Sequence, residues 1–553
     1  MNKMKTIKKA RASCLVCRVV NAARTALFAL LSIPTSLPLG GLGWALTLVF
    51  PFALTSCSDF FDIKPQTELV SDDFWQNKSD VESAVAACYR AMQEPDVMER
   101  LIAWGEMRSD NVLLGQSYNS DVNYILTANV DAGNGYAQWG PLYQVINYCN
   151  TVLEQMPAVQ QLDPNFKVGE LRAFEAEMKT LRALCYFYLV RTFGDVPFSL
   201  QAYSDDTRPF QLPRTSGDEI LSSLLSELTS IGDNFAKSVY SSTAATKGRV
   251  TQKTLWTLMA DISLWLGRYE ECINLCRRTL QTSLNPLTLE SAARYNRQLF
   301  GQGLSQESIF ELVFDSYTPN YVVNEMYGTT GGRSSLNQLS ALDWRNYSLF
   351  DGSDVRQHDF MFRNAGGAFI PIRKFVSYRR ESNSTQVVAA DYVTNQNTQP
   401  WIIYRLADVY LMMAEALVER NAEGDLTEAL QMVSYTYDRA NPSRGANSLS
   451  PSSYNAQELM RNLVFDERQR EFMFEGKRYF DLLRRIRRFP GQLDNVVSTY
   501  LLRKYESLDQ ATVLTRLNTL NALYMPVHRD ELKVNKLLRQ NPFYDTTSDI
   551  ERN

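Results

Sequence analysis

The sequence predicts a mostly α fold, a tetratricopeptide-like scaffold of helical hairpins with long irregular loops and little strand. Three observations carry this prediction. Apolar residues recur at intervals of three and four, two segments have the pattern of a helix, a short turn and a second helix, and long polar stretches separate these segments. An apolar content of 45% over 553 residues is typical of a folded protein with a large core.

The N-terminal residues 1–56 have the composition of a secretory signal. They contain seven basic residues and no acidic residue, and an apolar run occupies positions 42–54 near their end. Pro51 interrupts this run, which is also too short to span a membrane as a helix. We therefore expect residues 1–56 to be a cleaved leader rather than a membrane anchor.

The apolar run ends at Leu54-Thr55-Ser56-Cys57. A leucine three residues before a cysteine, with small residues between them, resembles the box at which bacterial lipoproteins are cleaved and lipidated. The acidic residues Asp59 and Asp62 come shortly after the cysteine, which resembles the signals that export lipoproteins to the cell surface. We expect Cys57 to carry the lipid and residues 57–78 to form a tether.

A long buried helix is expected in the region 178–192. Its apolar face is a stripe with spacings of three and four, formed by Met178, Leu181, Cys185, Tyr188 and Thr192. Gly194 and Pro197 follow this stripe, and these residue types commonly end a helix.

Two later segments have the pattern of tetratricopeptide-type helix pairs. The first spans 255–280 with a turn at 266–269, and the second spans about 406–432 with a turn near 423–425. A single pair cannot bury its apolar face alone, so these pairs are expected to stack against neighbouring helices.

A charged and aromatic block near the C-terminus has two interpretations. Glu467 and Arg470, and likewise Glu475 and Arg478, are three residues apart, a spacing at which opposite charges stabilise a helix. Glu467 and Glu471 could alternatively be catalytic acids. We favour the first interpretation, in which the charges pair inside a helical bundle.

Composition excludes several classes of function. The only histidines are His358 and His528, and neither lies in a metal-ligand motif, so no metal site and no cofactor is expected. Beyond residue 56 the formal net charge is −11, which argues against nucleic-acid binding. Five scattered cysteines form no disulfide framework, and we expect them to be small core residues: Cys88, Cys149, Cys185, Cys272 and Cys276.

Six blocks, in order along the chain, together resemble the SusD/RagB family. They lie at 62–66, 177–198, 264–273, 402–417, 465–484 and 523–526. Each block alone is weakly specific, but their shared order over nearly the whole mature chain makes coincidence improbable. On this resemblance, 79–240 is an N-terminal SusD-like region, and 241–553 is a helical-repeat and C-terminal SusD/RagB region.

The resemblance implies a surface-exposed lipoprotein of the outer membrane, held there by its lipid alone. Such proteins bind glycan oligosaccharides and deliver them to a SusC-like TonB-dependent transporter, and some members bind peptides instead. Two other classes remain open from the residues alone. A glycoside hydrolase needs two carboxylates about 5–10 Å apart, but no acid here lies in a hydrolase motif. A helical scaffold for partner proteins would lack glycan or peptide binding.

We expect the ligand to bind at two polar loops, 110–125 and 315–350, since long loops on a rigid scaffold are commonly functional. The candidate ligand-binding residues are Asp110, Asn111, Tyr118, Asn119, Tyr124, Tyr317, Tyr321, Tyr327 and Trp344. No catalytic residue is assigned. Trp139 precedes a predicted helix and could stack on a sugar, but we favour a role in core packing.

Overall fold

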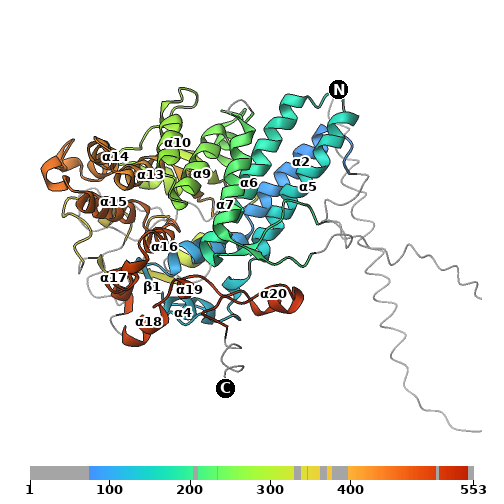
Figure 1. The fold of residues 1–553 in the computed structure, drawn as a ribbon. Coiled ribbons are helices and arrows are strands. Elements are labelled where there is room, and N and C mark those ends of the chain that lie inside the picture. The colour runs from blue at the N-terminus through green and yellow to red at the C-terminus, as the bar shows by residue number, and fades with distance from the viewer. Residues whose placement is uncertain are drawn as a thin grey trace, which may run out of the picture. The chain divides into compact units, whose positions relative to one another are not determined.

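Packed pairs of helices make up most of the fold (Figure 1). The pairs in the computed structural model are α2 (Lys78–Met92) with α5 (Gly140–Leu162), α6 (Val168–Phe193) with α7 (Gly217–Ile231), α9 (Gln252–Trp265) with α10 (Tyr269–Gln281), and α13 (Leu406–Arg420) with α14 (Asp425–Ala440). α10 packs on α13, and α15 (Gln457–Phe472) packs on both α13 and α14. The prediction of a mostly α fold is confirmed.

The structure describes the chain from residue 74 to residue 545 with internal gaps. The described residues are 74–203, 210–232, 235–328, 338–344, 347–361, 370, 372–375, 397–505 and 510–545. The predicted leader 1–56, Cys57 and most of the tether 57–78 lie outside them. These three features remain predictions.

Both predicted hairpins are present with their turns in the expected places. α9 and α10 are separated by three residues, and α13 and α14 by four. Gly267 and Gly424 adopt positive φ angles of 74° and 86° in these turns, a conformation that glycine adopts without a Cβ penalty. The local sequence therefore determines where each chain reversal occurs.

α6 is a long helix that is buried over most of its length. From Ala173 to Phe193, nearly every side chain is buried, so the helix is covered on all sides rather than on one face. It ends at Phe193 as predicted, and Gly194 follows with φ 73°. The five cysteines of the described residues are buried and free, which confirms their interpretation as core residues.

The little strand that is described forms three separate two-stranded antiparallel ladders. They are β1 (Val112–Leu114) with β5 (Leu339–Ala341), β2 (Val196–Pro197) with β3 (Arg214–Thr215), and β4 (Ser308–Leu312) with β6 (Trp401–Arg405). The β1–β5 and β4–β6 ladders join segments that are distant in sequence, and β1–β5 joins the two predicted ligand loops.

The segments expected to be irregular contain short regular elements. A π-helix (Ala103–Met107) continues α3 (Pro95–Ile102) toward the first loop, and α4 (Ser120–Leu126) and α11 (Tyr321–Tyr327) lie within the two loops. The other short helices are α8 (Thr243–Gly248), α12 (Arg356–Asp359), α16 (Arg478–Arg488), α17 (Leu493–Thr499), α18 (Gln510–Arg516), α19 (Leu520–Leu523) and α20 (Arg529–Val534). Figure 1 shows β1, α4, α19 and α20 gathered at one end of the long helices.

The division at residue 240 remains a prediction. Packing crosses this position, because α9 contacts both α6 and α7. Residues Thr67–Asn553 form one unit by the density of their contacts.

Candidate functional site

The two predicted ligand loops meet at the β1–β5 ladder. Val112 pairs with Ala341 and Leu114 pairs with Leu339, and the Gly115 amide donates a hydrogen bond of 2.8 Å to the Gln338 carbonyl. α4 contacts β1, and α11 contacts β5. The loops are therefore neighbours in space although about 200 residues separate them in sequence. This arrangement allows them to contribute to one surface.

Four of the predicted aromatic residues present their rings to solvent. Tyr317 is 94% exposed, and three other rings are 38–47% exposed: Tyr118, Tyr124 and Tyr321. Asn119 is exposed as well, and its Oδ1 caps α4 by accepting a hydrogen bond from the Val122 amide at 2.8 Å. Half-exposed tyrosines on loops supply apolar faces together with hydroxyl groups, which suits a hydroxyl-rich ligand.

Asp110 and Asn111 are buried, which corrects their prediction as ligand contacts. The Asp110 carboxylate accepts hydrogen bonds from the Arg478 guanidinium at 2.8 and 3.1 Å. Asn111 donates to the Glu106 carboxylate at 2.7 Å and accepts from Gln469 at 2.9 Å. Their polar groups therefore have internal partners, and they hold the base of the first loop.

Tyr327 and Trp344 are also buried, which removes them from the candidate surface. The Tyr327 ring stacks on Phe375 with a centroid distance of 5.6 Å and an interplanar angle of 8°. The Trp344 ring packs edge-on against Tyr347 at 5.7 Å. The Tyr327 ring therefore attaches the second loop to Phe375, which itself stacks on Trp401, whereas the Trp344 contact lies within the loop.

Buried polar contacts of Glu106 and Asp110 hold the base of the first loop. Burial opposes ionisation of Asp110, but the adjacent Arg478 guanidinium outweighs it and holds the pKa of Asp110 below its ordinary value. Burial raises the pKa of Glu106 to about 7, and the carboxylate accepts a hydrogen bond from the Gly476 amide at 3.0 Å. The loop that begins at residue 110 is thus attached to α16 and to the turn before it.

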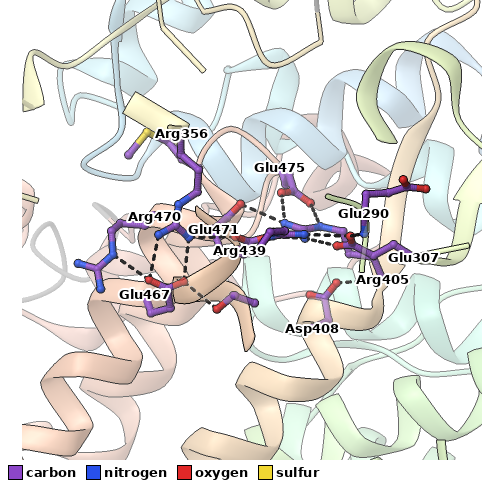
Figure 2. A network of polar contacts seen from close by, with 12 residues as sticks. Glu290, Glu307, Arg356, Arg405, Asp408, Arg439, Glu467, Arg470, Glu471 and Glu475 are labelled. Carbon is purple, nitrogen blue, oxygen red and sulfur yellow. Dashed lines mark hydrogen bonds and ion pairs between the residues drawn. The ribbon is translucent and has the colours of Figure 1, made fainter. Parts of the chain in front are cut away.

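The carboxylates of the charged block form ion pairs in the interior. Figure 2 shows Glu467, Glu471 and Glu475 facing arginine side chains from other elements. Arg405 contacts Glu307 at 2.8 Å, Glu471 at 2.5 Å and Glu475 at 2.7 Å. Each of these side chains is at most 1% exposed, so substrate has no access to them. The structure therefore supports the interpretation of Glu467 and Glu471 as buried ion-pair partners rather than as catalytic acids.

One local pair within this block is present, and one is replaced. Arg470 pairs with Glu467 at 2.8 Å as the helical spacing predicts. Arg478 instead pairs with Asp110, and Glu475 pairs with Arg405 and Lys374. The prediction of a Glu475–Arg478 pair is therefore wrong. Both residues are buried, and each forms its ion pairs with residues that are distant in sequence.

Neither a metal site nor a membrane-spanning helix is found among the described residues. Among the described residues, no group of three or more His, Cys, Asp or Glu side chains is placed to hold a metal ion. His528 is buried, and its Nδ1 accepts a hydrogen bond from the Asp530 amide at 3.2 Å at the start of α20. No helix in the described part of the chain has the length and apolar character needed to cross a bilayer.

Two family models match this chain. The SusD family model matches residues 357–544, and a model described as "starch-binding associating with outer membrane" matches residues 59–264. The chain belongs to the SusD/RagB family. A SusD-like protein of Formosa agariphila is 25% identical to this SusD/RagB protein over 480 residues, which cover 79% of this chain and 90% of the relative.

Solved structures show that this SusD/RagB protein has a SusD-like fold. A SusD superfamily protein from Bacteroides thetaiotaomicron superposes with a TM-score of 0.68 at 20% identity, covering 85% of this chain and 99% of that one. Surface glycan-binding protein A from Bacteroides uniformis gives a TM-score of 0.67 at 20% identity, covering 84% and 100%. SusD family proteins are non-catalytic binding proteins associated with the outer membrane, which agrees with the prediction of a binding role.

Proposed function

We propose that this protein is a surface-exposed outer-membrane lipoprotein that binds glycan oligosaccharides at its two paired loops and delivers them to a SusC-like TonB-dependent transporter. The observation that carries the binding site is the β1–β5 ladder, which brings exposed tyrosines from both loops onto neighbouring elements. The glycan ligand is supported by the description of the family model and by the glycan-binding structural relative.

Loss of the exposed loop rings is expected to abolish glycan binding. We expect a variant with alanine at Tyr118, Tyr124, Tyr317 and Tyr321 to migrate freely in native gels containing soluble starch, xylan or mannan, in at least one of which the wild type is retarded. Each lost stacking contact should cost roughly 1–3 kcal/mol of binding, by analogy with rings that stack on nucleic-acid bases.

Tyr435→Ala is the matched control, since this tyrosine is 39% exposed but lies on α14. The control should be retarded like the wild type. All three proteins should share one melting temperature, because exposed rings contribute little to the core. If the variant with four alanines is retarded as strongly as the wild type, the glycan site lies elsewhere.

Lipidation of Cys57 is expected to decide where the protein is found. We expect Cys57→Ala to leave the leader uncleaved or to release the protein from the membrane fraction, because the described residues contain no membrane-spanning helix. The measurements are intact mass and the distribution between membrane and soluble fractions. Cys149→Ala, at a buried core cysteine, is the control for loss of a thiol. An unchanged mass and membrane fraction in Cys57→Ala would rule out lipidation there.

The same preparations test the transporter partner. Affinity capture of the wild type in mild detergent should recover a large outer-membrane β-barrel protein, and capture of Cys57→Ala should recover less of it. Capture of the lipidated wild type without any such protein would count against the partnership.

A further inference from the structure

A cavity of ≈ 310 Å³ has no residue of the two ligand loops among its described wall residues. Its described wall residues lie in the first half of α5 and just before it, at one position of α6, in the described parts of the segment between β2 and β3, and in α20 with the residues after it. The volume lies at the lower end of the range of about 300–1,000 Å³ that is usual for small-molecule sites. The cavity therefore suits one small ring rather than an extended chain.

Aromatic rings dominate the wall of this cavity. Trp139 and Tyr143 are four residues apart and pack edge-on at 5.9 Å, and Tyr143 packs edge-on against Tyr186 at 6.1 Å. Tyr203 lies on the opposite segment, and Phe210, which is 58% exposed, lies at the rim. Trp139 is buried as expected of a core residue, but it also forms part of this wall.

The polar groups on the wall form a rigid frame. Asn147 and Tyr203 are joined by two hydrogen bonds, from the Asn147 amide to the Tyr203 carbonyl at 3.0 Å and from the Tyr203 N–H to Asn147 Oδ1 at 2.7 Å. Asn535 donates to the Leu212 carbonyl at 2.8 Å. Each of these side-chain amides has two N–H groups, so each retains a second donor on the wall of the cavity.

Among the described residues of this wall, Glu531 is the one with a charged side chain. Burial raises the pKa of its carboxyl, and a hydrogen bond donated by the Trp139 indole acts in the opposite direction. A carboxylate has about four acceptor sites, so one indole donor leaves most of them for a ligand. This carboxylate would repel an anionic ligand. A wholly apolar ligand would displace water from the carboxylate without replacing its hydrogen bonds.

We propose that this cavity is a second carbohydrate-binding site, which holds a single neutral sugar ring against Trp139 and Tyr143, with its hydroxyl groups bonded to Glu531 and the wall amides. A sugar ring presents apolar C–H faces together with hydroxyls that both donate and accept, and the wall offers aromatic rings, an acceptor and amide donors. A ligand amine would use the carboxylate but not the amide donors. The choice of a sugar as ligand class rests on the proposed glycan-binding function.

Saturation-transfer NMR on purified, detergent-solubilised protein tests this site. The probes are the methyl glycosides of glucose, galactose, mannose, xylose and N-acetylglucosamine, each at millimolar concentration. The cavity variants are made in the four-tyrosine loop variant, so that the loop site contributes no signal. In this background we expect transfer to at least one glycoside, an affinity roughly ten-fold weaker in Glu531→Gln through loss of a charge-assisted hydrogen bond, and no transfer in Val534→Trp. Val534 is a 62% exposed residue of the cavity wall, and tryptophan there would fill the opening.

Val239→Trp is the matched control, because Val239 is 51% exposed and is not part of the cavity wall. In the background of the four-tyrosine loop variant it should give the same transfer as that variant without any further substitution. In this background, transfer that persists in Val534→Trp, or an absence of transfer before any cavity substitution, would overturn the second site while leaving the loop site standing. Transfer to benzylamine that depends on Glu531, with none to any glycoside, would overturn the sugar assignment in favour of an amine. Loss of polysaccharide retardation in the loop variant tests the proposed function separately.

Discussion

Replacing Glu471 by alanine is expected to lower the free energy of unfolding by about 3–5 kcal/mol, the usual cost of removing one partner from a buried ion pair. Glu471 is fully buried and accepts hydrogen bonds from Arg356 at 2.9 Å, from Arg405 at 2.5 Å and from Arg439. Alanine would leave three guanidinium groups in the interior with one carboxylate fewer. The penalty comes from these stranded charges rather than from the lost volume.

Glu428→Ala provides the matched control for this effect. Glu428 also accepts two hydrogen bonds from one arginine, Arg277, but both side chains are about one-third exposed. Surface pairs of this kind contribute about 0–1 kcal/mol, because water screens them. Urea denaturation of the two variants should therefore give clearly different free energies of unfolding. Equal losses below 1 kcal/mol would show that the buried network does not stabilise the fold.

The pH dependence gives the same network a second readout. Burial opposes ionisation of Glu471, but Arg439, Arg405 and Arg356 outweigh it and hold the pKa of Glu471 well below its ordinary value of 4.5. A carboxyl with a lowered pKa in the folded state contributes stability that is fully present above pH 4.5 and is lost as the pH falls through the folded-state pKa. The difference in the free energy of unfolding between the wild type and Glu471→Ala should be constant near neutral pH. It should become smaller only at acidic pH.

Local patterns in the sequence predict the scaffold because each helical hairpin is specified by residues close to one another. The spacing of Met178, Leu181 and Cys185 identifies the apolar face of α6, and the glycines at 267 and 424 mark the turns. The pairing of loops across the β1–β5 ladder depends on contacts between residues about 200 positions apart, and no local pattern reports them.

The candidate ligand residues were predicted less well for the same reason. Asp110 lies in a polar stretch that is typical of a loop. It is a buried ion-pair partner only because Arg478, 368 residues away in the sequence, lies beside it. Tyr327 lies in a polar stretch, but its ring stacks on Phe375. The cavity near Glu531 was missed because it combines α5, α20 and the β2–β3 segment. The four-residue spacing of Trp139, which precedes α5, and of Tyr143 and Asn147 on α5 was the available signal.

Gly105→Ala is expected to destabilise the protein by about 3 kcal/mol or more and to weaken glycan binding. Gly105 lies in the π-helix Ala103–Met107, where an added Cβ would stand 1.7 Å from the Gly476 carbonyl oxygen. Overpacking against side chains typically costs about 1–3 kcal/mol, and here the obstacle is backbone, which cannot rotate away. Gly476 itself has φ 68° and donates its amide to Glu106, so the turn has little freedom to retreat.

Glycan binding is expected to weaken because the close approach of Gly105 and Gly476 positions the base of the first ligand loop. The π-helix leads directly into Asp110 and the first ligand loop, and the Gly476 turn leads into Arg478, which pairs with Asp110. Separating the two backbones would therefore shift the base of the loop relative to α16. Gly169→Ala is the control, since its Cβ would meet no atom within 4 Å at the start of α6, and alanine there should leave stability unchanged or raise it by about 0.4–1 kcal/mol. Thermal melts and retardation in polysaccharide gels measure both effects. A Gly105→Ala protein that melts and binds like the Gly169→Ala protein would show that this close approach does not hold the loop in place.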